Sequence, residues 1–174
     1  MAPRTTDPRA SERRTSDPRT ILLDLALQSK IPATGGLDAA GNAYKRVQTL
    51  FNDLCAPHKL LGARRDALDE VDVYFNNGHH DYDYQGLSSG QRGALQMFIR
   101  FAAEHIHNSI VLVDELEQNQ HPLWQRRLLH LLPRMGTNNQ IIATTHSPYL
   151  RDAVPPDAVI ELGGLGDGSH AEES

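Results

Sequence analysis

The sequence predicts an α/β domain in which a parallel sheet is flanked by helices. Two short apolar runs, 110–113 and 140–144, have the length and β-branched content of strands buried in such a sheet. Apolar residues recur at helical spacing before and between these runs, over 95–106 and 123–132. A strand that is apolar on both faces needs a helix on each side, so we expect helices to cover both faces of the sheet.

Polar residues end both predicted strands. Asp114 and Glu115 follow the first strand, and the second strand leads into Thr144, Thr145 and His146. Ligands of open α/β sheets bind beyond the carboxyl ends of the strands. Adjacent strand residues point to opposite faces, so one carboxylate can hold a metal while the other orients and deprotonates a water. The alternative is a strand that ends in a solvated acidic turn.

Composition indicates one domain of an ordinary globular protein. The 174 residues include 39% hydrophobic residues, and the formal net charge of −5 gives no electrostatic footprint for nucleic acid over the whole chain. Cys55 is the single cysteine, which favours a reducing compartment. No apolar run approaches the roughly 20 residues of a membrane helix, and the N-terminus lacks an apolar signal stretch. We therefore expect a cytoplasmic protein with no membrane partner.

Three regions are predicted along the chain. Residues 1–20 are polar and proline-rich and cannot bury enough apolar surface to order, so we expect a disordered tail there. Its five arginines against three acidic residues suit a phosphate backbone, although a solvated tail is the simpler interpretation. Residues 21–162 form the domain, and residues 163–174 form a small, polar, frayed C-terminal tail.

The first half of the domain contains two helices and a hairpin. A short helix is predicted over 20–30, followed by a glycine-marked loop at 35–41 and a second helix over 43–55. Alternating residues at 71–75 and 82–84, on either side of an Asn-Asn-Gly turn, predict a β-hairpin.

A serine- and glycine-rich turn precedes the amphipathic helix pattern. Ser88 and Ser89 are suitable N-cap residues, and Gly90, Gln91 and Arg92 follow them. The backbone N–H groups and the positive dipole end of such a helix favour an anion. Most capped helices bind nothing, however, so this feature is a weak signal by itself.

The second half of the domain contains a helix between the two polar strand ends and a last strand. Pro122 suits the first position of the helix, and Pro133 and Gly136 are expected to close it. A final strand is predicted over 159–162.

Three motifs stand in a fixed order: Leu87-Ser88-Ser89-Gly90-Gln91, then apolar-Asp114-Glu115, then Thr144-Thr145-His146-Ser147-Pro148. Together they resemble the C-terminal lobe of an ABC-type ATPase head. The resemblance is closest to the non-transporter branch that includes the SMC and RecF-like ATPases and the AAA-family proteins of overcoming-lysogenization-defect type. The pattern from Asp114 to Arg127 is the most specific part, and the similarity extends over 71–162. It implies a P-loop NTPase-like layered sheet with flanking helices.

The resemblance also implies ATP and Mg²⁺ as cofactors and gives residues their roles. Asp114 would bind Mg²⁺ through water as the Walker B aspartate, and Glu115 would position the attacking water. His146 would be the switch histidine that senses the γ-phosphate, and 117–121 would form the D-loop at a dimer interface. Contacts to the nucleotide of an opposing subunit would come from the signature motif, Ser88, Ser89, Gly90 and Gln91. Such phosphoryl transfer depends on positioning and charge stabilisation.

Two departures from the family pattern shape the functional hypothesis. Residues 118–120 are Gln-Asn-Gln where relatives commonly have Leu-His-Leu. No Gly-Lys pair occurs in the chain, whose three lysines are Lys30, Lys45 and Lys59, so no phosphate-binding P-loop is present in these residues. We therefore expect an ABC-type C-terminal half-domain that lacks the Walker A lobe.

Several partner and function hypotheses remain open for such a half-domain. A second ATPase polypeptide with a Walker A loop, or a second copy in a homodimer, would complete the ATPase. DNA or a DNA-associated complex is the other partner that the resemblance suggests. The alternatives to an ATPase head are a non-catalytic, split or truncated half-ATPase that binds a partner, and a DNA-associated accessory module. A half-ATPase without the P-loop would expose an edge or an apolar face of its sheet, which favours hetero-association or poor solubility.

Overall fold

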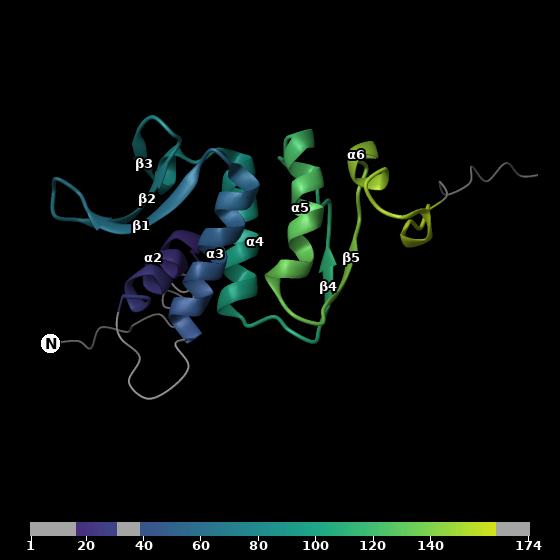
Figure 1. Cartoon of the computed structure of the whole chain (residues 1–174), viewed down its shortest axis with the longest axis horizontal. Helices are drawn as coiled ribbons and strands as arrows, with labels where there is room; N and C mark the ends of the chain where they lie inside the picture. Colours follow the sequence, from purple (N-terminus) through teal and green to yellow (C-terminus); the bar gives the residue numbers. More distant parts are fainter. Residues whose placement is uncertain (1–16, 31–38, 163–174) are drawn as a thin grey trace, which may run out of the picture.

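Two small sheets lie on either side of a layer of helices in the computed structural model, which describes residues 17–30 and 39–162 (Figure 1). The helical layer consists of α3 (Ala39–Cys55), α4 (Ser89–Ala103) and α5 (Pro122–Met135). The short helix α2 (Pro18–Gln28) packs against α3 and the first sheet. The tails predicted at 1–16 and 163–174, and the loop glycines at 35 and 36, lie outside the described residues.

The first sheet is antiparallel and contains, in order, β1 (Lys59–Arg65), β2 (Val71–Asn76) and β3 (Asp81–Asp83). The predicted hairpin is confirmed, since Phe75 pairs with Tyr82 across the turn. The sequence pattern does not predict β1, because a register shift at Gly62 interrupts the alternation of its side chains. Gly62 has a φ of +122°, and a Cβ there would lie 3.1 Å from the Tyr44 hydroxyl, so the bulge requires glycine.

The core lies between this sheet and the helices α3 and α4. Phe51 and Phe75 are fully buried, and their ring centroids are 5.2 Å apart. Leu95, Phe98 and Ile99 of α4 complete the same cluster. These positions recur at helical spacing, so one apolar stripe of each helix faces the core, as the sequence pattern predicts.

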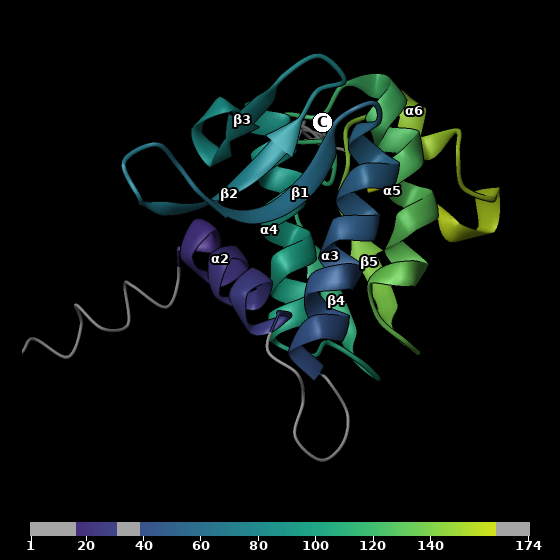
Figure 2. The same cartoon turned by 60° about the vertical axis from the view of Figure 1, so that its left-hand side comes forward.

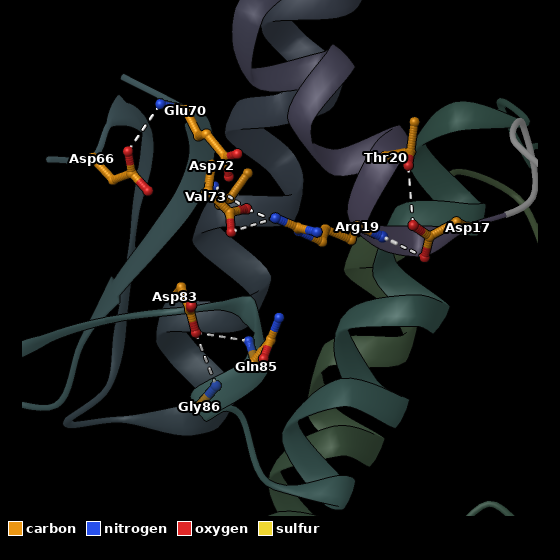
Figure 3. Close-up of polar contacts among 10 residues, drawn as sticks. All are labelled: Asp17, Arg19, Thr20, Asp66, Glu70, Asp72, Val73, Asp83, Gln85 and Gly86. Carbon is orange, nitrogen blue, oxygen red and sulfur yellow. Dashed lines mark hydrogen bonds and ion pairs between the residues drawn. The ribbon is translucent and has the colours of Figure 1, made fainter. Parts of the chain in front are cut away.

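Helix α2 is fixed to the sheet by one ion pair (Figure 3). The Arg19 guanidinium donates from Nε and Nη2 to the two carboxylate oxygens of Asp72, at 3.1 and 2.7 Å. Hydrogen bonding to Asp72 raises the pKa of Arg19. The Asp17 carboxylate caps the helix by accepting from Arg19 N and from the Thr20 hydroxyl. Residues 18 and 19, predicted as tail, therefore begin the first helix, and Asp17 is its N-cap.

The second sheet is a parallel pair, β4 (Ile110–Val113) and β5 (Gln140–Ala143), joined by α5. Both predicted strands are confirmed, but the expectation that helices cover both faces is wrong for the described residues. Val111, Val113 and Ile141 are partly buried and pack against the core. Figure 2 shows the pair β4 and β5 beside α5. On the opposite face, the exposed fractions of Ile110, Leu112 and Ile142 are 68%, 76% and 50%. This open apolar face, Ile110, Leu112 and Ile142, is unusual because parallel sheets are normally covered on both sides.

Four smaller expectations need correction. Gly41, placed in a loop by its type, lies inside α3. Pro133 does not end α5, because a proline in the last turn leaves only one carbonyl without its helical partner, and the helix ends at Gly136. The pattern up to Ile106 overestimates α4, which ends at Ala103. Residues 159–162 form no strand, since no strand among the described residues pairs with them.

Candidate functional site at the carboxyl edge of the parallel sheet

The carboxyl ends of β4 and β5 bring the acidic pair and the histidine segment together. The ladder continues one residue past the strands, with Thr144 N donating to Val113 O at 2.9 Å. The Thr144 hydroxyl then donates to Asp114 Oδ1 at 2.6 Å and accepts from Glu115 N at 2.8 Å. One threonine side chain therefore fixes both members of the acidic pair to the neighbouring strand, as the parallel arrangement predicts.

At Glu115 the chain turns sharply away from the sheet. Its φ of +47° is left-handed, a conformation that costs a non-glycine residue about 1 kcal/mol or more. The turn closes with Gln118 N donating to Glu115 O at 2.8 Å. The carboxylates of Asp114 and Glu115 are both exposed beyond the sheet edge. The geometry can therefore present two carboxylates to a ligand from a rigid backbone.

Glu117 joins this turn to the segment after β5. Its carboxylate accepts from the Thr145 hydroxyl and from His146 N, both at 2.6 Å. Partial burial raises the pKa of Glu117, but the hydrogen bonds from Thr145 and His146 outweigh it and hold the pKa below its ordinary value. The sequence identifies Glu117 only as part of a loop, although a third acidic residue beside Asp114-Glu115 is the signal that could have indicated this role.

The serine- and glycine-rich turn forms the start of α4, as predicted. Ser88 is the N-cap, and a capping box links its side chain and backbone to Gln91. Ser88 and Ser89 are exposed, whereas Gly90 and Gln91 are buried. The side chain of Gln91 is committed to the Ser88 N–H, so a ligand at this turn would meet the serines and the backbone.

Residues 119 and 120 connect this helix start to the acidic turn. Gln120 Nε2 donates to Gly90 O at 2.9 Å, and a Cβ at Gly90 would lie 2.4 Å from Asn119 O. Gln125 also holds the loop by donating to Gln120 O at 3.0 Å. The Gln120 amide nitrogen thus links the loop to the start of α4, while its Oε1 is buried without a hydrogen-bond partner among the described residues.

The residues at this edge fit a cation whose remaining ligands are water and phosphate oxygens. Within 17–30 and 39–162, no group of three or more His, Cys, Asp or Glu side chains could hold a metal by itself. Asp114 can supply one carboxylate oxygen beside the one that Thr144 occupies. Mg²⁺ commonly takes one or two carboxylates together with water and phosphate oxygens, so a single aspartate suits a nucleotide-bound Mg²⁺.

Fold and edge geometry together define a P-loop NTPase-like α/β domain of the AAA type. The family model described as "AAA domain, putative AbiEii toxin, Type IV TA system" matches residues 23–152. The chain belongs to this family. The prediction of an ATPase-related domain is confirmed at this level.

Individual relatives cover smaller parts of the chain. The Septu protein PtuA of Bacillus thuringiensis is 28% identical over 108 residues, which are 55% of this chain and 27% of PtuA. A probable ATPase of retron Ec83 from Escherichia coli is 46% identical over 41 residues, 24% of this chain and 8% of that protein. The chain therefore corresponds to about a quarter or less of each of these curated relatives.

A solved structure supports the fold. The SMC head bound to the C-terminal winged-helix domain of ScpA has a TM-score of 0.51 and 13% identity, covering 84% of this chain and 48% of the SMC chain. At this identity the likeness concerns the fold alone. No helix of the described part of the chain combines the length and apolar character needed to cross a membrane.

Proposed function

We propose that the chain is part of a Mg²⁺-dependent ATPase head and contributes one side of a composite nucleotide site. The observation that carries the proposal is the hydrogen-bonded edge at which Asp114, Glu115, Glu117 and His146 meet. Membership of an AAA family supports it. The SMC-head fold supports it further, because the resemblance gives these same positions roles in ATP hydrolysis.

Each residue at the edge has a defined task in this proposal. Asp114 would hold Mg²⁺ through water, and Mg²⁺ would neutralise phosphate charge when bound. The Glu115 carboxylate would orient the attacking water and accept its proton. His146, on a segment fixed by Glu117, would contact the γ-phosphate. The exposed start of α4, with Ser88 and Ser89, would face a nucleotide held on an opposing subunit.

The composite nature of the site rests on two observations. The chain contains no Gly-Lys pair that could serve as a phosphate-binding P-loop. The open apolar face of β4 and β5 also needs a cover, because exposed aliphatic side chains in a parallel sheet are costly. A lobe that carries a Walker A loop and covers this face would satisfy both requirements. It can belong to a second polypeptide or to sequence outside these 174 residues, but not to a second copy of them, which would lack the same loop.

A comparison of the isolated chain with its native assembly tests the proposal. We expect no saturable Mg²⁺-ATP binding by the purified chain in calorimetry. The assembly purified from the source organism through a tag on this chain is expected to hydrolyse ATP in the presence of Mg²⁺. Hydrolysis that does not depend on Mg²⁺, or an assembly without turnover, would contradict the ATPase assignment. Saturable binding by the isolated chain would contradict the composite site.

Leu112→Glu should separate assembly from folding. Leu112 is 76% exposed, so glutamate there removes little buried area and should change the free energy of unfolding by less than about 1 kcal/mol. A charge in the centre of the open apolar face should prevent its burial by the Walker A lobe. Size-exclusion chromatography with light scattering should therefore show loss of the assembly.

Leu68→Glu is the matched control for this variant. Leu68 is 81% exposed in the turn between β1 and β2, away from the open apolar face. This control should assemble normally. Normal assembly of Leu112→Glu would show that the face is not covered by a partner lobe.

A non-catalytic partner-binding half-ATPase is the second candidate, favoured by the same lack of a Gly-Lys pair. Under this hypothesis Leu112→Glu would still disrupt assembly. The wild-type assembly, however, would show no ATP turnover.

Glu117→Gln should weaken the acid dependence of stability. The pKa of Glu117 is lowered in the folded chain, so the unfolded chain binds more protons as the pH falls through about 4, and stability falls with it. The contribution is complete above about pH 5. Glutamine does not titrate, and urea denaturation between about pH 3 and pH 6 should show a flatter slope for this variant.

Glu104→Gln, at the exposed C-cap of α4, is the isosteric control. Its slope should match that of the wild type. Equal slopes for Glu117→Gln and wild type would indicate that the bonds to Thr145 and His146 N do not persist in solution.

A further inference from the structure

A depression between α3 and α5 is lined almost entirely by polar and basic side chains. Its volume is about 360 Å³, and its lining consists of Asn42, Lys45, Arg46, Thr49, Leu50 and Arg134. Helix α5 connects two parallel strands, so it runs from the edge of the sheet where β4 ends back to the edge where β5 begins. Arg134, in the last turn of α5, therefore lies toward the amino ends of the parallel strands. The depression is thus separate from the candidate ATP edge.

Helices α3 and α5 together carry five lysine and arginine residues and one acidic residue, although the whole chain carries a net charge of −5. Arg134 Nη1 pairs with Asp53 of α3 at 2.8 Å, and the Arg134 side chain remains 51% exposed. Neither Lys45 nor Arg46 has an ion-pair partner among the described residues. Exposed arginines continue along α5 at Arg126 and Arg127. One acidic side chain therefore faces several cations on two adjacent helices.

The lining can bind phosphate groups but offers a nucleobase no surface to stack on. Guanidinium and ammonium groups donate hydrogen bonds to phosphate oxygens, and Asn42 adds an amide donor. The Thr49 hydroxyl donates to Lys45 O at 2.9 Å, so it offers only an acceptor. No aromatic side chain lines the depression, which leaves no surface on which a base could stack.

The arrangement of the cations favours a chain of phosphates over a single one. Lys45 and Arg46 are adjacent in a helix, so their side chains leave it about 100° apart and reach the depression from different directions. Arg134 approaches from the second helix. Cations spread in this way suit successive phosphates that cross the junction of the two helices.

We propose that the α3–α5 junction, Lys45, Arg46 and Arg134, binds the phosphodiester backbone of nucleic acid independently of its sequence. This site adds a nucleic-acid contact to the proposed ATPase head and does not depend on ATP binding. Backbone contacts of this type fix position on a nucleic acid and depend strongly on salt. Net negative charge elsewhere on the chain would orient the nucleic acid toward the junction.

Fluorescence anisotropy with a short labelled DNA duplex tests the proposal on the full chain. The wild type should bind at roughly 50 mM salt and weaken steeply toward roughly 200 mM. The double variant Lys45→Ala/Arg46→Ala should bind about 10-fold or more weakly, and its plot of log K against log salt should be shallower by about two. Thermal melting should change little, because Lys45 is exposed, Arg46 is half-buried, and neither forms an ion pair among the described residues.

The double variant Arg64→Ala/Arg65→Ala is the matched control. It removes the same charge from β1, where both arginines form exposed ion pairs of small energetic value. It should retain wild-type affinity and salt slope. Equal loss in both double variants, or no duplex binding by the wild type, would overturn the proposal. So would NMR shifts at Asn42–Thr49 with inorganic phosphate but not with the duplex, which would indicate a site for a small anion.

Discussion

Replacing Glu115 with glutamine is expected to reduce ATP turnover by the native assembly by about 10²- to 10⁴-fold. The amide has the shape of the carboxylate but cannot accept a proton from water. The left-handed turn and the bond from Glu115 N to the Thr144 hydroxyl involve only the backbone of residue 115 and should persist. ATP-driven association should therefore remain, and steady-state phosphate release together with light scattering would measure the two properties separately.

Glu104→Gln serves again as the isosteric control and should leave phosphate release unchanged. If Glu115→Gln turns over ATP at the wild-type rate, Glu115 is not the catalytic base. If the variant also fails to associate with ATP, Glu115 contributes to nucleotide binding rather than to the chemical step. In either case the nucleic-acid contact at the α3–α5 junction is unaffected, because Lys45, Arg46 and Arg134 are remote from this edge.

Local patterns predicted the elements on which the edge is built. The apolar runs before Asp114 and Thr144 specify parallel strands, and the order of strand and helix patterns requires their carboxyl ends to share an edge. Pro122 specifies the start of α5 because its fixed φ and missing N–H suit a first helical position. Ser88 and Gln91 specify the start of α4 through a capping box.

Features that depend on distant contacts were not predictable in the same way. β1 contains Gly62 at a bulge, so its side chains do not alternate regularly. Ile110 and Leu112 by themselves indicate a buried face, and only the missing Gly-Lys pair indicated that an edge or an apolar face of the sheet would be exposed. The bridge from Glu117 to Thr145 and His146 joins residues almost thirty positions apart. Only the fold brings these residues together.

Gly90→Ala is expected to destabilise the chain and displace the loop that leads into α5. A Cβ at residue 90 would lie 2.4 Å from Asn119 O. This oxygen belongs to the backbone, so it can move only if the loop from Glu115 to Gln120 shifts. Such overpacking typically costs about 1–3 kcal/mol, and the bond from Gln120 Nε2 to Gly90 O would be strained as well. We expect a lower midpoint in urea denaturation and faster amide exchange in this loop.

Gly93→Ala provides the control within the same helix. A Cβ at residue 93 would meet only Gln120 Nε2, at an ordinary contact distance of 4.0 Å. Alanine is favoured over glycine inside a helix by about 1 kcal/mol, so this variant should be as stable as the wild type or more stable. Opposite effects of the two substitutions would show that the start of α4 and the acidic loop pack as one unit. Equal stability of Gly90→Ala and Gly93→Ala would show that the loop moves freely relative to α4, and the start of α4 and the acidic edge would then be positioned independently.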